Sequence, residues 1–343
     1  MGMKSELQAL IARRSFLKAA AVGGASAFQG VWPDIAAAEP EPETRRIRLA
    51  HGSSAVCVAP EYMAEPIFAT EGFTDVQYLN EPRLGEIYRR LAAGDADIMV
   101  AFVANFVHQV DAGAPIVMLA GIHPGCYELF TTGGIRSVKD LKGRKVSIPE
   151  RNGAHHLFTA MLVTHVGLDP QRDIDWVIQP PDEALRKLAE GGIDALMGFP
   201  PVPQELRAKR IGQSILSSVA DKPWNQYFCC VVAANRAFAK KNPVATKRAL
   251  RAILKGNHVC ATEPEKTARF LVERGITPNY DYAVQALKEL PYSRWRDFSA
   301  EDSVRFTALR MQEGGFIKSD PKSIIAKGTD WRFFNELKTE LKT

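Results

Sequence analysis

The stretch Leu91-Ala-Ala-Gly-Asp-Ala-Asp-Ile-Met-Val-Ala-Phe102 decides the fold, because it returns as Leu188-Ala-Glu-Gly-Gly-Ile-Asp-Ala-Leu-Met-Gly-Phe199 at a constant offset of 97 residues. The register extends upstream, where Glu86 matches Glu183. In each copy we expect a helix that ends near glycine, which adopts a left-handed backbone readily, and then a buried strand that starts at aspartate and stops at phenylalanine. The repeat predicts two α/β lobes with one copy in each. The alternative is chance recurrence of a helix–Gly–Asp–strand pattern, which is common in α/β folds.

Around the repeat, short strand-like runs alternate with segments of helical pattern. Strands separated by helices of this length are typical of βαβ units and parallel sheets, so the chain is predicted to be an α/β protein. From about Pro243 onward the pattern is helical only. The predicted strands are 47–50, 76–79, 98–102, 116–120, 145–149, 174–178 and 193–199, and the predicted helices are 85–93, 105–112, 154–166, 182–190, 244–261, 264–274, 300–313 and 331–341.

The first 38 residues have the pattern of an export signal. Arg13-Arg-Ser-Phe-Leu-Lys18 precedes a short apolar run at 19–28, and Ala36-Ala-Ala38 supplies small residues suited to cleavage. The paired arginines resemble a bacterial twin-arginine signal, although Ala12 replaces the usual Ser or Thr. We therefore expect cleavage near Ala38, passage through the twin-arginine translocase, a short linker at 39–46 and a periplasmic mature protein.

Composition excludes several classes of function. Without residues 1–38, which hold four basic and two acidic residues, the 44 Lys and Arg and the 39 Asp and Glu become 40 and 37. This near balance, with no dense basic run, does not fit nucleic-acid binding. After the leader, no apolar run approaches the roughly 20 residues that cross a bilayer.

The five cysteines show no spacing typical of zinc, haem or iron–sulfur binding, and we expect them to act as small buried hydrophobic residues. Cys229 and Cys230 are adjacent in a strand-like run at 227–233, so their side chains should point to opposite faces. His155 and His156 are also adjacent, and on a helix such neighbours rarely share one ion. No nucleophile elbow, phosphate-binding loop or dinucleotide fingerprint is present. We expect no metal, no cofactor and no catalytic residues.

Four segments resemble the periplasmic solute-binding proteins of ABC importers, in the group that binds nitrate, taurine, aliphatic sulfonates and thiamine-pyrimidine precursors. They are Ala59-Pro-Glu-Tyr62, the stretch 91–102, Ala112-Gly-Ala-Pro-Ile116, and Ser137-Val-Lys-Asp-Leu-Lys-Gly-Arg-Lys-Val-Ser-Ile-Pro149. The last is the most specific, because it is similar to the family's entry into its second lobe. The resemblance covers nearly all of the mature chain.

This resemblance implies a type II periplasmic-binding-protein fold, in which two lobes joined by two crossover strands close on a small solute. It implies lobe 1 at 47–125, lobe 2 at 126–232, and a return to lobe 1 with C-terminal helices at 233–343. The crossings are expected near 126–132 and 227–233. The implied partners are a small anionic organic solute, of sulfonate, nitrate or carboxylate type, and the membrane permease of an ABC importer; we expect a monomer.

In open α/β sheets, ligands bind beyond the carboxyl ends of the strands, so the loops that follow strands are the candidates. His51-Gly-Ser-Ser54 follows the first strand and offers hydroxyl and backbone N–H groups to an anion, although its serines could simply cap a helix. Asn152-Gly-Ala-His-His156 is the equivalent loop of the second lobe, where Asn152 is either a helix cap or a neighbour of free N–H donors.

The two loops after the repeat carry aromatic residues that could form apolar walls, with core packing as the alternative for each. Trp224, just before the expected return crossing, could line the same cleft or pack in the hinge. The candidate ligand-binding residues are His51, Ser53, Ser54, Phe102, Asn105, Asn152, Gly153, Ala154, His155, Phe199, Pro200 and Trp224.

Three other functions fit parts of the sequence. An exported enzyme is one, since many proteins exported through the twin-arginine route carry redox cofactors, but no cofactor motif is present. A relative of the eukaryotic pyrimidine synthases is another, and would make His51 or the pair Cys229-Cys230 reactive. A receptor that reports to a membrane sensor is the third. Aromatic walls favour an organic anion over nitrate.

Overall fold

The computed structural model describes residues 39–51, 55–81 and 84–341, and shows two separate five-stranded sheets. In each sheet three strands are parallel, and the strand beside the third of them runs antiparallel. The first sheet has the order β2 (Asp75–Asn80), β1 (Arg46–His51), β3 (Ile98–Phe102), β10 (Phe228–Asn235) and β4 (Ile116–Pro124). The second has the order β7 (Asp175–Ile178), β6 (Lys145–Ile148), β8 (Ala195–Gly198), β5 (Glu128–Thr131) and β9 (Gln213–Ser217). We call the residues around these sheets the first and second lobes.

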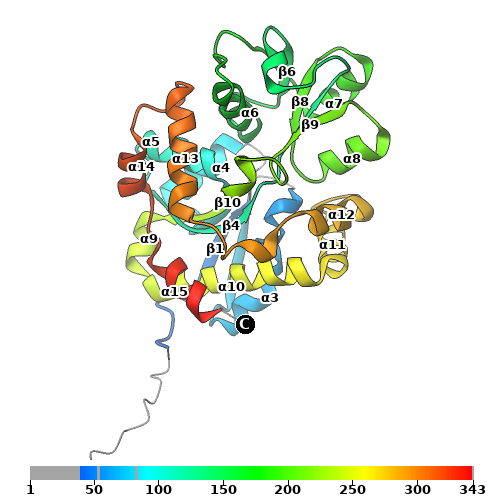
Figure 1. Ribbon diagram of the computed structural model, residues 1–343. Coiled ribbons are helices and arrows are strands. Elements are labelled where there is room, and N and C mark those ends of the chain that lie inside the picture. The colour runs from blue at the N-terminus through cyan, green and yellow to red at the C-terminus, as the bar shows by residue number, and fades with distance from the viewer. Residues whose placement is uncertain (1–38, 52–54, 82–83, 342–343) are drawn as a thin grey trace, which may run out of the picture. The chain divides into compact units, whose positions relative to one another are not determined.

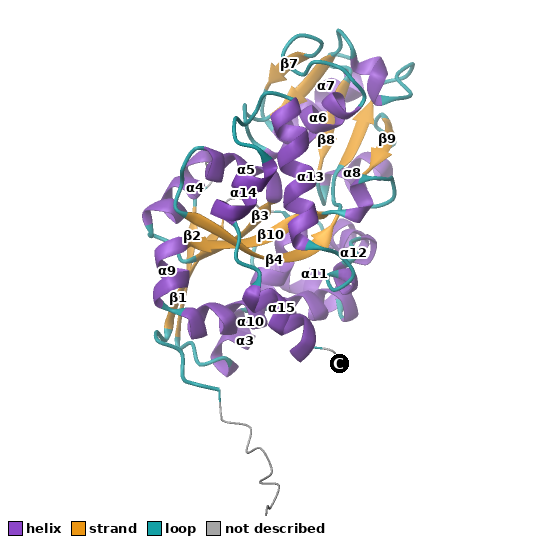
Figure 2. Cartoon of the chain, turned by 60° about the vertical axis from the view of Figure 1, so that its left-hand side comes forward, coloured by secondary structure: helices purple, strands orange, loops and turns teal. Residues whose placement is uncertain are grey.

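Helices flank both sheets, and the C-terminal helices gather on the first lobe (Figures 1 and 2). This arrangement confirms the α/β class and the periplasmic-binding-protein fold expected from the sequence. The second lobe holds α6 (Ala154–His165), α7 (Pro181–Glu190) and α8 (Val202–Lys209). The first lobe holds α2 (Ala59–Met63), α3 (Glu65–Thr70), α4 (Leu84–Ala93), α5 (Val103–Asp111), α9 (Arg236–Lys241), α10 (Pro243–Thr262), α11 (Pro264–Glu273), α12 (Tyr280–Glu289), α13 (Ala300–Glu313), α14 (Pro321–Gly328) and α15 (Arg332–Glu340).

The internal repeat has the predicted structure in both lobes. Gly94 and Gly191 follow their helices with φ angles of 84° and 74°, in the left-handed region that glycine adopts without steric cost. The strand of the first copy ends at Phe102 as expected. The strand of the second copy, expected to reach Phe199, ends at Gly198, because its neighbour β5 begins at Glu128 opposite that glycine.

The aspartate of each repeat binds the backbone of the central parallel strand of its own sheet, β1 in the first and β6 in the second. The Asp97 carboxylate accepts a hydrogen bond from the Arg48 backbone N–H at 2.8 Å, and the Asp194 carboxylate accepts one from Lys145 N–H at 2.9 Å. Arg48 and Lys145 are themselves 97 residues apart, so the offset extends to this contact. In the first lobe the Arg48 guanidinium also binds Asp97 with both Nε and Nη2, at 3.1 and 2.6 Å.

The chain crosses between the sheets twice, and the second crossing differs from the expectation. The first lies between Pro124 and Glu128, close to the expected 126–132. The return crossing was expected near 227–233, but β10 pairs with β3 and β4 of the first sheet from its first residues. The return crossing therefore lies between Ser217 and Phe228, and residues 228–232 belong to the first lobe.

The two crossings are hydrogen-bonded to each other. Ser218 Oγ accepts the backbone N–H groups of Cys126 and Tyr127, at 2.9 and 2.8 Å. Gly125 is required at this contact, because its φ is +57° and a Cβ atom there would lie 2.2 Å from the Ser218 carbonyl oxygen. Position 125 in the first crossing therefore requires glycine, because the backbone of the second crossing at Ser218 leaves no room for a side chain.

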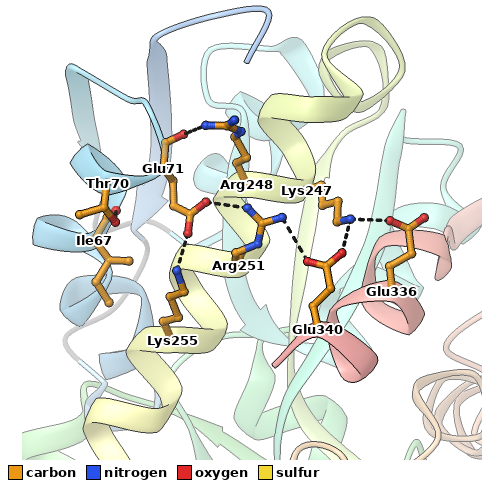
Figure 3. A network of polar contacts seen from close by, with 9 residues as sticks. All are labelled: Ile67, Thr70, Glu71, Lys247, Arg248, Arg251, Lys255, Glu336 and Glu340. Atoms are coloured by element: carbon orange, nitrogen blue, oxygen red, sulfur yellow. Dashed lines mark hydrogen bonds and ion pairs between the residues drawn. The ribbon is translucent and has the colours of Figure 1, made fainter. Parts of the chain in front are cut away.

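A charged network joins α10 to its neighbours α3 and α15 (Figure 3). Glu71, buried after the end of α3, accepts hydrogen bonds from Arg251 at 2.8 Å and Lys255 at 2.7 Å. Arg251 also reaches Glu340 on α15 at 3.2 Å. Two cations therefore compensate the burial of the Glu71 carboxylate, as a buried charge requires.

The structure also adds α12 and α14 to the four C-terminal helices expected from the sequence.

None of the helices in the described part of the chain is both long and apolar enough to cross a membrane. The predicted export signal at 1–38 lies outside the described residues.

We predict that replacing the two repeat aspartates has unequal effects on stability. Asp97→Asn should lower the free energy of unfolding by about 2–3 kcal/mol, because Asp97 is 2% exposed and its loss leaves the Arg48 guanidinium without its carboxylate partner. Asp194→Asn should cost about 1 kcal/mol, because its half-buried side chain lies 3.9 Å from the Arg144 guanidinium. Urea unfolding monitored by circular dichroism measures both, and equal losses would contradict a special role for the Arg48 pair.

Candidate functional site

A cavity opens where the carboxyl ends of strands from both sheets meet. The space within it that a water-sized sphere can enter is about 50 Å³, small beside the roughly 300–1,000 Å³ usual for small-molecule sites. His51 and Phe102 lie at the ends of β1 and β3, while Ala154 and Phe199 come from the second lobe after β6 and β8. The other described residues that line it are Ala55, Cys57, Val58, Tyr88, Met99, Val100, Ala101, Tyr127 and Cys230.

One wall of the cavity is a cluster of aromatic rings centred on Tyr127. The Tyr127 ring stacks on Phe158 with centroids 4.7 Å apart and meets Phe102 edge-on at 5.0 Å. Phe199 lies 5.8 Å from Tyr127 and 4.7 Å from the His155 ring. Because Tyr127 belongs to the first crossing, this wall joins residues of both lobes and of the segment between them.

Two hydrogen bonds to backbone carbonyls join the lobes beside the cavity. The N–H of Val56, in the 3₁₀ turn η1 (Val56–Val58), donates to the Pro200 carbonyl at 3.2 Å. Asn105 Nδ2 of α5 donates to the Asn152 carbonyl, also at 3.2 Å. The structure therefore brings Asn105 and Asn152 together, and also Pro200 and η1. From the sequence alone, Asn105 and Asn152 were assigned to separate loops in different lobes.

His51 supplies a buried polar atom to the cavity. Its ring stacks on Tyr62 at 4.3 Å, and its Nδ1 lies 3.5 Å from the fully buried Glu61 carboxyl. Burial lowers the pKa of His51 to about 4, so its imidazole is neutral at pH 7, and burial raises the pKa of Glu61 well above its usual range. Among the described residues His51 Nε2 has no hydrogen-bond partner, which makes it available to a ligand.

The loop before α6 differs in detail from its expected form. The N-cap of α6 is Gly153, with no side-chain cap, whereas Asn152 is exposed and has a φ of +59°. Its backbone N–H donates to His156 Nδ1 at 2.9 Å, which fixes the turn. The interpretation of Asn152 as a helix cap is therefore wrong, because its left-handed backbone lies outside the N-cap geometry. Ala154, at the first helical position, lines the cavity.

Of the twelve candidate residues, His51, Phe102, Ala154 and Phe199 line the cavity. Asn105, Asn152, Gly153, His155 and Pro200 do not, and His155 lines a smaller cavity within the second lobe instead. Ser53 and Ser54 lie outside the described residues. Trp224 is 5% exposed and packs against Phe158 and Phe306, both at 5.3 Å, so its surroundings are those of the hinge-packing alternative. It lines a smaller cavity behind Phe102 that also touches α13.

Sequence reasoning missed Tyr88, Tyr127, Cys57 and Cys230 as lining residues. Tyr127 could have been predicted from the sequence, because it lies in the expected first crossing, and a segment that joins two lobes must pass the cleft between them. Cys230 faces the cavity because β10 is antiparallel and begins at the edge where β3 ends. Among the described lining residues there is no lysine or arginine.

These sheets, crossings and cavity define a periplasmic-binding-protein fold with an interlobe pocket. The fold is shared with the periplasmic nitrate-binding protein NrtA from Synechocystis PCC 6803 (TM-score 0.73, 16% identity, covering 88% of this chain and 90% of that one). It is also shared with a putative periplasmic sulfonate-binding protein, SsuA, from Methylobacillus flagellatus KT (0.65, 19%, 87% and 94%), and with the alkanesulfonate-binding protein SsuA from Xanthomonas axonopodis pv. citri bound to MOPS (0.66, 15%, 86% and 100%).

The chain belongs to the NMT1-like family, whose model matches residues 41–274. Comparison with curated proteins gives no match. The family assignment and the fold agree with the resemblance to ABC-importer binding proteins that the sequence motifs showed.

We predict that the histidines around the cavity remain neutral well below neutral pH. Burial lowers the pKa values of His51, His155 and His156 to about 4, from an ordinary value of 6.5. Between pH 4 and 6.5 the unfolded chain therefore binds more protons at these histidines than the folded protein does. Their contribution lowers the free energy of unfolding as the pH falls through this range. The raised pKa of Glu61 has the opposite effect on the free energy of unfolding. An NMR titration of the imidazole resonances, assigned with single His→Gln variants, measures each pKa, and midpoints near 6.5 would contradict the prediction.

Proposed function

We propose that this protein is the extracytoplasmic substrate-binding component of an ABC importer and captures a small organic anion between its two lobes. The observation that carries the proposal is the cavity lined from both lobes, at the carboxyl ends of both sheets. A ligand there contacts both lobes at once, so its binding favours the closed arrangement over an open one. The protein's role in this proposal is capture and delivery to a permease rather than catalysis.

The lining favours an organic ligand over nitrate. Its surface is mainly aromatic and aliphatic, with Tyr127, Phe102 and Phe199 forming a wall suited to a flat or apolar group. Nitrate has no apolar part to bury against such a wall, and among the described residues no guanidinium or ammonium lines the cavity to pair with it. An organic solute gains free energy from burying its body as well as from its polar contacts.

Polar recognition in this proposal comes from neutral donors. In the tautomer with its proton on Nε2, His51 donates to a ligand oxygen, and this nitrogen has no hydrogen-bond partner among the described residues. The uncapped start of α6 offers backbone N–H groups at Ala154, where the helix dipole favours negative charge. Nitrate and sulfonate binding in the structural relatives named above, and MOPS in one of them, support an anionic head group of sulfonate or carboxylate type.

A ligand screen tests this function. We expect organic sulfonates or carboxylates to raise the unfolding temperature of the protein, and nitrate to leave it unchanged, because binding to the folded state alone stabilises it. Pyrimidines belong in the same panel. No stabilisation by any organic ligand, or stabilisation by nitrate alone, would contradict the proposal.

A matched pair of variants then tests the cavity. Phe199→Ala should weaken binding of the best ligand about tenfold, because truncation removes an aromatic wall of the site. Phe270→Ala is the control: Phe270 is half-buried like Phe199, but lies on α11 away from the cavity. Isothermal titration calorimetry measures both, and equal losses of affinity would show that the ligand binds elsewhere.

The same proposal includes export through the twin-arginine route, cleavage near Ala38 and a monomeric periplasmic protein. We predict that Arg13→Lys with Arg14→Lys retains the full-length precursor in the cytoplasm of a bacterial host, whereas Arg45→Lys with Arg46→Lys, a paired-arginine control after the cleavage site, is exported normally. Cell fractionation and intact mass give the result, with a mature N-terminus at Glu39. Unchanged export of the first variant would contradict this route.

A further inference from the structure

Four side chains of types that can ligate a metal meet beside the cavity. They are Cys57, His123, Cys126 and Cys230, and their ligand atoms all lie within 4.8 Å of one another. All four residues are buried, with His123 at 0% exposure and the three cysteines at 3–4%. Sequence spacing does not reveal the set, because its members come from η1, β4, the first crossing and β10.

The fold itself brings these residues together. His123 and Cys230 are register partners on the neighbouring strands β4 and β10. Cys126 follows β4 in the first crossing, where Ser218 Oγ binds its backbone N–H. Cys57 approaches from the other side, and its carbonyl oxygen lies 3.1 Å from His123 Nε2. The cluster is therefore held by backbone contacts that do not depend on an ion.

The contacts of His123 place both ring nitrogens against carbonyl oxygens. Its Nδ1 lies 2.9 Å from the Gly125 carbonyl oxygen and its Nε2 lies 3.1 Å from the Cys57 carbonyl oxygen. A neutral imidazole carries one N–H, so only one of these contacts is then a hydrogen bond, whereas a protonated ring donates in both. Metal binding therefore requires the neutral ring and a shift of the carbonyl that faces the bare nitrogen, while the other N–H···O=C bond orients the ring as in known metal sites.

Three thiols and one imidazole form the Cys₃His donor set of tetrahedral structural zinc sites. With Zn–S of about 2.3 Å and Zn–N of about 2.0–2.1 Å, the ligand atoms of such a site lie roughly 3.5–3.8 Å apart. The observed spread of up to 4.8 Å thus needs a contraction of up to about 1.3 Å. Cys57 and Cys230 also line the cavity, which supplies the entry path.

We propose that Cys57, His123, Cys126 and Cys230 bind one zinc ion beside the interlobe cavity. The ion anchors the first crossing to the first sheet, because Cys126 belongs to the crossing and His123 and Cys230 belong to β4 and β10. Since Tyr127 follows Cys126 directly, zinc also holds the central ring of the aromatic wall.

A neighbouring thiol competes for one of the ligands. Cys229 Sγ lies 2.8 Å from Cys126 Sγ, so oxidation that joins these two sulfurs would remove Cys126 from the metal site. The binding experiment therefore uses reduced protein in the absence of air. Cys229→Ser keeps Cys126 available and should bind metal as the wild type does.

Cobalt titration of the reduced full chain tests the site. We expect one equivalent of Co²⁺ to bind with the sulfur-to-cobalt charge-transfer absorption of three thiolates and the visible bands of tetrahedral cobalt, zinc to displace it, and zinc to raise the unfolding temperature. Cys230→Ser and Cys57→Ser should each lower the affinity at least tenfold. Cys260→Ser is the matched control, because Cys260 is fully buried in α10 but lies outside the cluster.

Circular dichroism of each variant separates loss of the site from loss of the fold, and His123→Gln provides a fourth test if a cysteine variant does not fold. The proposal is overturned if the reduced wild type binds no stoichiometric cobalt, if its spectrum lacks thiolate charge transfer, or if folded Cys230→Ser binds as tightly as wild type.

Discussion

The buried Asp97 carboxylate and its counterpart Asp194 set the frame on which the rest of the structure depends. Each accepts a backbone N–H from the central parallel strand of its sheet, β1 or β6, and each follows a glycine in a left-handed conformation. A carboxylate at this point satisfies a backbone donor beside the strand and fixes the register of β3 against β1 and of β8 against β6. With that register set, both sheets direct the carboxyl ends of their strands toward one cavity.

The cavity and the cysteine–histidine cluster share structural elements. β10 contributes Cys230 to both, and the first crossing contributes Tyr127 to the wall and Cys126 to the cluster. The crossings themselves are joined through Ser218 and restricted by the need for glycine at position 125. Metal binding or oxidation at Cys126 would therefore change the segment that connects the lobes. This links the proposed zinc site to the geometry of the proposed ligand site without any contact between the ion and the solute.

Much of the frame could be predicted from local pattern. Apolar runs predicted β1, β3, β6 and β10 to within one or two residues, since a strand buried on both faces is nearly continuous in apolar residues. The bounds of β2 were predicted equally well, although its side chains are half-buried or exposed. The end of β8 and the return crossing were misplaced, because strand ends depend on the length of the paired strand, and the membership of 228–232 depends on pairing with β3 and β4. Asn152 was misread because its left-handed backbone leaves no local signature.

The sequence by itself determined the class of fold, through the repeat at offset 97, and the loops after its strands, where His51, Phe102, Ala154 and Phe199 lie. These features are local, since periodicity and strand ends are written in consecutive residues. Only the tertiary structure decided which side chains meet: Tyr127 in the aromatic wall, Glu61 beside His51, and Cys57, His123, Cys126 and Cys230 in one cluster. Such groupings join segments up to 173 positions apart, from Cys57 to Cys230, and arise from strand pairing and burial rather than from spacing along the chain.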